Sequence, residues 1–412
     1  MEYYNMLLPL AIILIMSKLL AKACTKFNLP TVVGLLVTGL LMSLIRYIPG
    51  QTILDATALD GLGFLAKIGV ILIMFETGLE TDVKQLRDVG VGAVIITMAG
   101  VAVPMGLGFV AAVLFHGGFA NLTHDAMVSC LFYGTILTAT SVSVTVTTLR
   151  EMGRISSKVG STIVTAAVLD DIIGVVVLSF VIAMQNTAAV VTSPMLVVGR
   201  IVLFFVCAIP LGIVLNKLFD LLDHRYPHHR MIPILSLALC FFFAYASEKF
   251  FGVADITGAF VAGIVLARNP DRSYIERKSD VMSYMIFTPV FFANIGLTIT
   301  FNGISETMML FGICFILAGI VGKVIGCGGM AMLCGYKPLD GLRIGIGMMA
   351  RAEVALVCAQ KGVESGIIDS SIMPFILILI IVTSFITPIT LRLTSKNEPM
   401  PETAAATPEK QG

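Results

Sequence analysis

The sequence is short of charge. Only 13% of its 412 residues are Asp, Glu, Lys or Arg, about half of the ~25% that is usual for a soluble domain. A soluble protein of this length needs many more charged side chains to cover its surface, so the shortage excludes an ordinary soluble fold. The formal net charge of +1 also gives no electrostatic basis for binding nucleic acid, and no nucleic-acid partner is expected.

Motifs for bound metals and for signal cleavage are missing as well. None of the eight cysteines forms a CxxC pair, and most lie inside apolar segments, so we interpret them as small buried apolar residues. No cofactor is expected. The N-terminal stretch MEYYNMLLPL lacks the basic region and the small-residue cleavage site of a signal peptide, so the first apolar segment is predicted to be an uncleaved span.

Apolar residues are abundant instead. They make up 57% of the chain, and the mean hydropathy is +0.96. The apolar runs approach the ~20 residues that a helix needs to cross a bilayer, whereas barrel strands would be shorter and alternating. The sequence therefore predicts an all-α polytopic membrane protein surrounded by a lipid bilayer. Its 13 expected transmembrane helices cover residues 5–24, 31–46, 61–77, 91–115, 126–149, 159–184, 193–218, 231–248, 254–267, 280–297, 307–333, 340–360 and 371–391.

Lysine and arginine are distributed unequally between the two sets of loops. Of 27 such residues, 19 fall in the loops of one side or at the C-terminus, 3 fall on the other side, and 5 lie within apolar segments. Cytoplasmic loops carry the excess of Lys and Arg, so we expect the N-terminus outside and the C-terminus in the cytoplasm. Residues 392–412 are polar and rich in Pro and Ala, which predicts a short disordered cytoplasmic tail.

Thirteen segments suggest an internal duplication within a membrane domain of residues 1–391. Repeat one would cover about 5–184, a linker helix about 193–218, and repeat two about 231–391. Corresponding segments are then seven positions apart in the series of spans. Because successive spans cross the membrane in opposite directions and seven is odd, the two repeats have opposite orientations in the membrane.

Two corresponding segments carry residues that interrupt a helix. One contains LTATSVSVTVTTL (137–149), a run of hydroxyl and β-branched side chains, and the other contains GIGMMARAEVAL (345–356), with glycines and two charges. We expect these to be broken helices that cross at a binding site. For the first, the alternative is a continuous helix whose hydroxyls bond back to the preceding turn.

Two adjacent acids stand in a long apolar run. Asp170 and Asp171 are the only ionisable residues between positions 159 and 184. An acid in the membrane is costly unless it is paired, protonated or in contact with a water-filled path. Burial and mutual repulsion disfavour two simultaneous negative charges, so the pair must titrate as a coupled unit. A deprotonated carboxylate is also a hard oxygen ligand, so a proton and a monovalent cation would compete for it. The alternative is a structural pair that caps a helix or binds a basic residue.

Lys323 is the candidate partner, within GIVGKVIGCGG (319–329). A salt bridge to Asp170 would stabilise both charged forms. A cation arriving at Asp171 would then weaken the salt bridge and release a proton from the lysine. The alternative is a permanent structural ion pair that takes no part in transport.

Further ionisable residues are weaker candidates. Arg351 and Glu353 lie in the second interruption, where they would neutralise helix ends or each other, with direct contact to the ion as the alternative. Glu76, in IMFETGLETD (73–82), would be an access or binding acid or an interfacial residue. One loop contains three histidines that would form a pH sensor or a solvated basic loop: His224, His228 and His229.

With these residues in view, the sequence resembles a bacterial sodium/proton antiporter of the monovalent cation:proton antiporter-2 group, in particular the NapA-type exchangers. The resemblance extends from about residue 5 to 391. It is carried by seven motifs in order: FETGLETD (75–82), LTATSVSVTV (137–146), VLDDIIG (168–174), GAFVAGIVLA (258–267), FFANIGL (291–297), GKVIG (322–326) and ARAEVAL (350–356).

The resemblance implies a fold with a mobile core, formed by segments 4–6 and 11–13, and a dimerisation domain. It implies elevator-like transport, a homodimer, and a location in the bacterial inner (plasma) membrane. Asp171 would be the main ligand of the cation and the proton, and Asp170 would pair with Lys323. Hydroxyls and carbonyls of residues 138–141, including Thr138 and Ser141, would shape the site. An aspartate pair with a lysine resembles the electrogenic exchangers, whereas electroneutral relatives usually carry Asn-Asp and an arginine.

The expected function is therefore exchange of Na⁺ or Li⁺ for H⁺, without enzymatic activity. A K⁺/H⁺ antiporter would use the same residues and stays an alternative. An intramembrane enzyme needs acids on two helices, typically with a GxGD motif, and a metal-diphosphate site needs DDxxD; neither pattern occurs around Asp170 and Asp171. A passive channel is the remaining alternative, because a channel does not require a titrating lysine.

Overall fold

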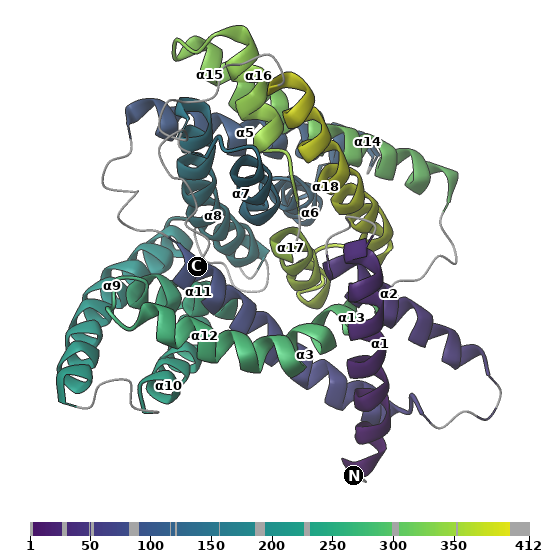
Figure 1. Ribbon diagram of the computed structural model, residues 1–412. Coiled ribbons are helices and arrows are strands. Elements are labelled where there is room, and N and C mark those ends of the chain that lie inside the picture. Colours follow the sequence, from purple (N-terminus) through teal and green to yellow (C-terminus); the bar gives the residue numbers. More distant parts are fainter. Residues whose placement is uncertain are drawn as a thin grey trace, which may run out of the picture. The chain divides into compact units, whose positions relative to one another are not determined.

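In the computed structural model, all regular secondary structure of the described residues is helical (Figure 1). The described residues are 3–26, 31–48, 50, 53–81, 90–115, 117–119, 122–155, 157–185, 194–225, 231–298, 305–351 and 353–395. The chain divides into two compact units. Unit 1 comprises Met1–Lys84 and Val176–Thr300, and unit 2 comprises Gln85–Val175 and Phe301–Gly412. Helix α8 (Lys158–Gln185) contributes residues to both.

Unit 1 contains eight further α-helices in its described part. They are α1 (Leu7–Lys26), α2 (Thr31–Ser43), α3 (Ala56–Glu80), α9 (Pro194–Arg225), α10 (Met231–Ala246), α11 (Asp255–Leu266), α12 (Arg272–Met282) and α13 (Thr288–Thr298). A π-helical turn, η5 (Ser283–Phe287), joins α12 to α13. Buried apolar side chains of α1, α2, α3 and α13 form one cluster that includes Ile13, Met42, Leu62 and Val290.

Two helix crossings in unit 1 depend on glycine. On α3, a Cβ at Gly78 would lie only 3.0 Å from the Cα of Gly263 on α11. On α2, a Cβ at Gly39 would lie 2.8 Å from the Cα of Gly296 on α13. Membrane helices are held together by van der Waals packing, and small residues let their backbones approach closely. The four glycines therefore set how close these two pairs of helices come.

We predict that Gly78→Ala destabilises the protein by about 1–3 kcal/mol, because the added methyl group must displace backbone atoms of α11. Gly63→Ala on the same helix is the matched control, since an added Cβ there meets no described atom within 4 Å. The control should be neutral or about 1 kcal/mol more stable, as Ala favours helix over Gly. Thermal unfolding in detergent measures both variants, and equal melting temperatures would contradict the account of the crossing.

Unit 2 contains the remaining helices. They are α5 (Val91–Phe115), α6 (His124–Ile136), α7 (Val142–Glu151), the larger part of α8, α14 (Glu306–Lys323), the π-helix η6 (Val324–Gly329), α15 (Met330–Leu333), α16 (Pro338–Gly347), α17 (Glu353–Glu364) and α18 (Met373–Ser395). Side chains of α5, α8, η6 and α16 share a buried cluster that includes Ile96, Ile163, Cys327 and Ile344.

Both predicted interruptions are present. The segment expected at 126–149 forms α6 and α7, which are separated by residues 137–141, and the segment at 340–360 forms α16 and α17. A continuous helix over 126–149, the alternative, is wrong. The hydroxyls of Thr140 and Thr145 donate to main-chain carbonyls of Met348 and Gly347 in the second interrupted segment, whereas those of Thr138 and Thr148 bond back to Thr135 and Val144.

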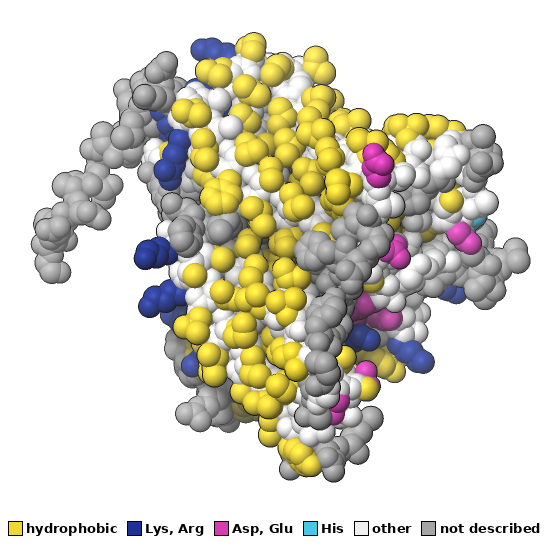
Figure 2. All heavy atoms as spheres, turned by 90° about the vertical axis from the view of Figure 1, so that its right-hand side faces the viewer, with side chains coloured by type: hydrophobic (Ala, Val, Ile, Leu, Met, Phe, Trp, Pro, Cys, Tyr) yellow, Lys and Arg dark blue, Asp and Glu magenta, His cyan; other side chains and the backbone are white. Residues whose placement is uncertain are grey.

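In the part of the chain that the structure describes, nine helices are long and apolar enough to cross a membrane. Helices α2 and α11 are apolar but shorter, with 13 and 12 residues, and each interrupted segment consists of two short helices, so the count of thirteen spans stays a prediction. Hydrophobic side chains cover most of the face in Figure 2, and Lys and Arg gather along one edge of it. The chain is a helical multi-pass membrane protein.

Several boundaries differ from the expected ones, among them the start of α3 and the end of α18. Helix α3 begins at Ala56, before the expected start at 61, because the Asp55 side chain accepts a hydrogen bond from the Ala58 N–H at 2.7 Å and caps the helix. Helix α18 continues to Ser395, past the expected end at 391. The rest of the expected tail, residues 396–412, lies outside the described residues. So do His228, His229 and the side chain of His224.

Candidate functional site

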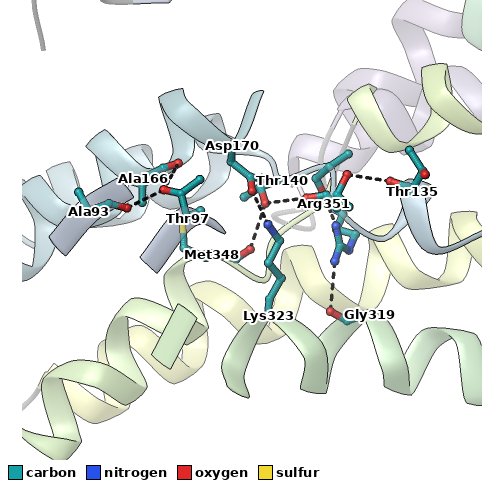
Figure 3. A network of polar contacts seen from close by, with 12 residues as sticks. Ala93, Thr97, Thr135, Thr140, Ala166, Asp170, Gly319, Lys323, Met348 and Arg351 are labelled. Atoms are coloured by element: carbon teal, nitrogen blue, oxygen red, sulfur yellow. Dashed lines mark hydrogen bonds and ion pairs between the residues drawn. The ribbon is translucent and has the colours of Figure 1, made fainter. Parts of the chain in front are cut away.

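A fully buried ion pair lies at the centre of unit 2. The ammonium of Lys323, the last residue of α14, donates a hydrogen bond of 2.7 Å to Oδ1 of Asp170 on α8 (Figure 3). Neither side chain is exposed. Removing either charge from water is costly, and the cost is offset only when an opposite charge is in direct contact. The structure thus contains the predicted contact, in which each charge offsets the cost of burying the other.

Asp171 follows on the same helix. Successive residues of an α-helix are turned by about 100°, so its carboxyl points away from the direction of Asp170. Asp170 is buried, whereas Asp171 is only partly buried. The two adjacent acids thus have different surroundings, and only Asp170 is in contact with the lysine.

A π-helical turn follows Lys323 directly, and glycines on both sides of the lysine, Gly322 in α14 and Gly326 in η6, pack on α5. A Cβ at Gly322 would lie 2.8 Å from the Cα of Pro104, and a Cβ at Gly326 would lie 2.6 Å from the carbonyl oxygen of Ala99. Such π-helical turns occur frequently at functional sites. The close approach of α5 covers the lysine on this side, which explains why it is fully buried.

The two interruptions are hydrogen-bonded to each other. The Ser141 N–H donates to the Ala350 carbonyl at 2.7 Å, and the hydroxyls of Thr140 and Thr145 donate to Met348 and Gly347 at 3.3 and 2.7 Å. The ends of a helix leave backbone N–H and C=O groups without intrahelical partners. Here each interrupted segment satisfies groups of the other.

Thr138 brings the first interruption against α8. Its hydroxyl donates to the Thr135 carbonyl at 2.8 Å and lies 3.8 Å from the position that a Cβ on Gly174 would occupy. Gly174 is one helical turn beyond Asp170. The structure therefore gathers Thr138, Ser141, the two aspartates and Lys323 in one part of unit 2.

Arg351 links the second interruption to both the first interruption and α14. Its fully buried guanidinium donates to the carbonyls of Ala139 and Gly319, the latter at 3.2 Å (Figure 3). Its main-chain N–H donates to the Thr383 hydroxyl on α18. Arg351 thus joins the first interruption to α14 through these two carbonyls, and its role in neutralising helix ends stays a prediction. The side chain of Glu353 lies outside the described residues.

Glu76 belongs to α3 in unit 1. Three further acids lie near its carboxyl: Glu80, Glu276 and Asp280. Its Oε1 atom is buried and has no hydrogen-bond partner among the described residues. Glu76 is thus a second acid inside an apolar helix, with surroundings unlike those of Asp170.

Comparison with known proteins identifies the family. The family model described as "Sodium/hydrogen exchanger, transmembrane" matches residues 11–396. The chain belongs to the sodium/hydrogen exchanger family. It is a cation/proton antiporter with Na⁺ and H⁺ as its transported substrates, and the enzyme alternative is wrong.

This exchanger is similar to curated proteins over nearly its whole length. It is 32% identical over 395 residues to the Na⁺/H⁺-K⁺ antiporter GerN of Bacillus cereus, covering 95% of this chain and 96% of GerN. It is 30% identical over 443 aligned positions to the high-affinity Na⁺/H⁺ antiporter NhaS3 of Synechocystis, covering 98% and 94%. The structure of the sodium proton antiporter MjNhaP1 of Methanocaldococcus jannaschii has a TM-score of 0.71 at 17% identity, with 94% and 95% covered, and shows the shared fold.

Sequence reasoning about the exchanger missed one polar residue near the ion pair. The Thr97 hydroxyl on α5 donates to the Ala93 carbonyl at 2.9 Å and to the Ala166 carbonyl at 3.3 Å, one turn before Asp170 (Figure 3). A lone threonine in an apolar helix usually bonds only to its own preceding turn, so no sequence pattern pointed to this contact.

We predict that Lys323→Gln and Asp170→Asn each destabilise the exchanger by about 3–5 kcal/mol, because each leaves one buried charge without its partner. The double variant should lose less than the sum of the two, since it leaves neither charge behind. Chemical unfolding in detergent micelles provides the cycle. Additive losses would mean that the 2.7 Å contact does not couple the two residues.

Proposed function

We propose that this exchanger moves Na⁺ or Li⁺ in one direction and H⁺ in the other by competition at Asp171, with Asp170 and Lys323 as its coupled partners. The observation that carries the proposal is the fully buried Lys323–Asp170 pair, which lies directly beside a second, partly buried carboxyl. Thr138 and Ser141 supply hydroxyl and carbonyl oxygens around a cation bound there, and no cofactor takes part. Arg351 fixes the interruptions and does not contact the ion.

Charge balance supports this competition. With Asp170 ionised and both basic groups protonated, the buried residues Asp170, Lys323 and Arg351 sum to a formal +1. An ionised, empty Asp171 brings the sum to zero, whereas either a proton or a monovalent cation on Asp171 returns it to +1. As long as Lys323 stays protonated, the two loaded states carry the same charge, and in a poorly solvated site each can replace the other at low electrostatic cost. Release of the lysine proton lowers the sum of the cation-loaded state to zero.

The number of protons moved per cation depends on whether Lys323 releases its proton. A cation on Asp171 attracts the neighbouring Asp170 carboxylate and weakens its bond to Lys323. A buried lysine without its anion favours the neutral form, so it releases a second proton. Two protons would then move against one cation, and exchange would be electrogenic. If the ion pair is permanent, one proton moves per cation and exchange is electroneutral.

K⁺ is the second candidate cation. The similar protein GerN is named as a Na⁺/H⁺-K⁺ antiporter. A carboxylate with hydroxyl and carbonyl oxygens can coordinate Na⁺ or K⁺. The same residues would serve K⁺/H⁺ exchange, and the transport assay below separates the two.

We further propose an elevator-type antiporter of the NapA-type subgroup. The core implied by the resemblance, segments 4–6 and 11–13, covers about 91–184 and 307–391, close to unit 2 at Gln85–Val175 and Phe301–Gly412. Unit 2 would be the moving core, and unit 1 the scaffold that forms a homodimer. The aspartate pair with a lysine supports the subgroup.

The glycine crossings of unit 1 support two inverted repeats. A shift of seven segments converts α2 into α11 and α3 into α13, so it exchanges the crossing α2–α13 with the crossing α11–α3. The glycines follow this exchange: Gly39 corresponds to Gly263, and Gly78 corresponds to Gly296. The excess of Lys and Arg on one side supports an outer N-terminus and a cytoplasmic C-terminus, in a bacterial inner (plasma) membrane.

Glu76 is proposed as an access acid rather than as a member of the paired site. The acids near its buried carboxyl would give a local negative charge that attracts cations. The adjacent acid Glu80 is exposed.

We predict that Asp171→Asn abolishes cation-dependent proton flux and leaves the protein folded, because the amide neither binds a proton nor neutralises a cation. The assay uses sealed proteoliposomes with an imposed pH gradient, to which Na⁺, Li⁺ or K⁺ is added in turn. Asp125→Asn is the matched control, since that carboxyl is 81% exposed on α6 and should not matter. Wild-type flux in Asp171→Asn would contradict the assignment of Asp171 as the binding residue. Flux of the unmodified protein with K⁺ alone would favour K⁺/H⁺ exchange.

We predict that Lys323→Gln converts electrogenic exchange to electroneutral exchange, because the second proton carrier is lost. Current on a solid-supported membrane, divided by the cation flux of the same preparation, measures charge per cation. The ratio should fall to zero in the variant. An unchanged ratio would show that the lysine proton takes no part in transport.

A further inference from the structure

Helix α1 carries a strip of exposed lysines. Lys18, Lys22 and Lys26 are exposed and recur every four residues, a spacing that places side chains on one face of a helix. Within the part of the chain that the structure describes, no acidic group lies within 4 Å of their ammonium groups. The strip thus presents uncompensated positive charge on the surface of unit 1.

Lys18 lies deep in an apolar surface. It is eight residues, or about 12 Å of helix, before Lys26, and its neighbours Ile15 and Leu19 are 62% and 65% exposed. Its ammonium lies 3.0 Å from the centre of the Tyr284 ring, a cation–π contact. Tyr284 is itself 56% exposed, so the contact leaves the charge accessible at the membrane-facing surface.

A second set of basic side chains lies toward the same end of unit 1. Ile13, before Lys18, belongs to the cluster with Val290 on α13, whereas Lys18 contacts Tyr284 on η5. Helix α1 is therefore antiparallel to the α12–η5–α13 run, and residues of α12 before Tyr284 lie alongside the C-terminal part of α1. Two exposed residues there are Arg277 and Lys278, about 10 Å of helix from the tyrosine.

Apolar and acidic neighbours define the ligand further. Between the basic residues and the membrane centre, Val281 and Met285 are 53% and 56% exposed. Of the acids on α12, Glu276 is engaged by Arg272 at 3.8 Å, and Asp280 is exposed. The five basic groups outnumber the one acid of α12 that Arg272 does not engage, so this side of unit 1 carries an excess of positive charge next to exposed apolar side chains.

We propose that this surface binds an anionic phospholipid, with its phosphate headgroup on the α1 lysines and Arg277 and its acyl chains on the exposed apolar residues beside Lys18. Basic pockets between membrane helices bind anionic headgroups. The adjoining apolar side chains favour a lipid over a free phosphate ion. This site uses none of the residues of the proposed exchange site and does not depend on it.

The test is lipid titration of the purified full-length exchanger in neutral detergent, followed by native mass spectrometry. Phosphatidylglycerol should bind more tightly than phosphatidylcholine, and Lys22→Gln/Lys26→Gln should weaken it about 25-fold, or about fivefold per lysine. The matched control is Lys217→Gln, an exposed lysine of α9, which should change nothing. Lys22→Arg/Lys26→Arg should retain the affinity, because charge is kept.

Three outcomes would overturn the proposal. Equal affinity for the two lipids would show that the headgroup charge is not recognised. Competition by inorganic phosphate at the concentration of the lipid would indicate a simple anion site. A change of oligomeric state in Lys22→Gln/Lys26→Gln, with lipid affinity unchanged, would show that a second copy of the chain covers the strip.

Discussion

The structure of unit 2 depends on one salt bridge that is shielded from water. Lys323 and Asp170 have no exposed side-chain surface, so each is stable in its charged form only while the other stays in contact. That requirement fixes the distance between α8 and α14. It also makes glycine necessary on the side where α5 approaches η6, since larger residues at Gly322 and Gly326 would collide with the α5 backbone.

The two interruptions leave main-chain groups that need hydrogen-bond partners inside the protein. A helix that ends in the middle of an apolar region exposes N–H and C=O groups that water cannot reach. Here residues 137–141 and the segment around Met348 satisfy each other through main-chain and threonine hydrogen bonds. Arg351 adds a positive charge at the carbonyls of Ala139 and Gly319. Polar atoms are thereby concentrated beside the aspartates, where the proposed cation site requires oxygen ligands.

Much of this arrangement could be predicted from the sequence because the decisive residues are conspicuous there. Two adjacent acids, one lysine and one arginine stand out in apolar segments, and charges in such segments must find partners. The run at 137–149 indicated a break because its hydroxyl and β-branched side chains pack poorly as a regular helix. The salt bridge between Lys323 and Asp170 followed from these constraints.

Other features could not be predicted. Thr97 resembles any threonine in a helix until the carbonyl of another helix is known to lie opposite, and the partners of Thr140 and Thr145 in the second interruption are not written in the sequence either. Among 38 glycines, the sequence does not distinguish Gly78, which touches a neighbouring backbone, from Gly63, which touches nothing described. The number of spans also stays open, because helices as short as α2 and α11 do not cross a bilayer by length alone.

The central claim is that a proton and a cation occupy the same carboxyl in turn. It is tested most directly by adding Na⁺ to the purified exchanger in weakly buffered detergent solution and recording proton release with a pH indicator, with choline as the ionic-strength control. If binding is competitive, each bound Na⁺ displaces about one to two protons, and a higher proton concentration weakens Na⁺ binding by the reciprocal linkage. Saturable Na⁺ binding without proton release would contradict the account.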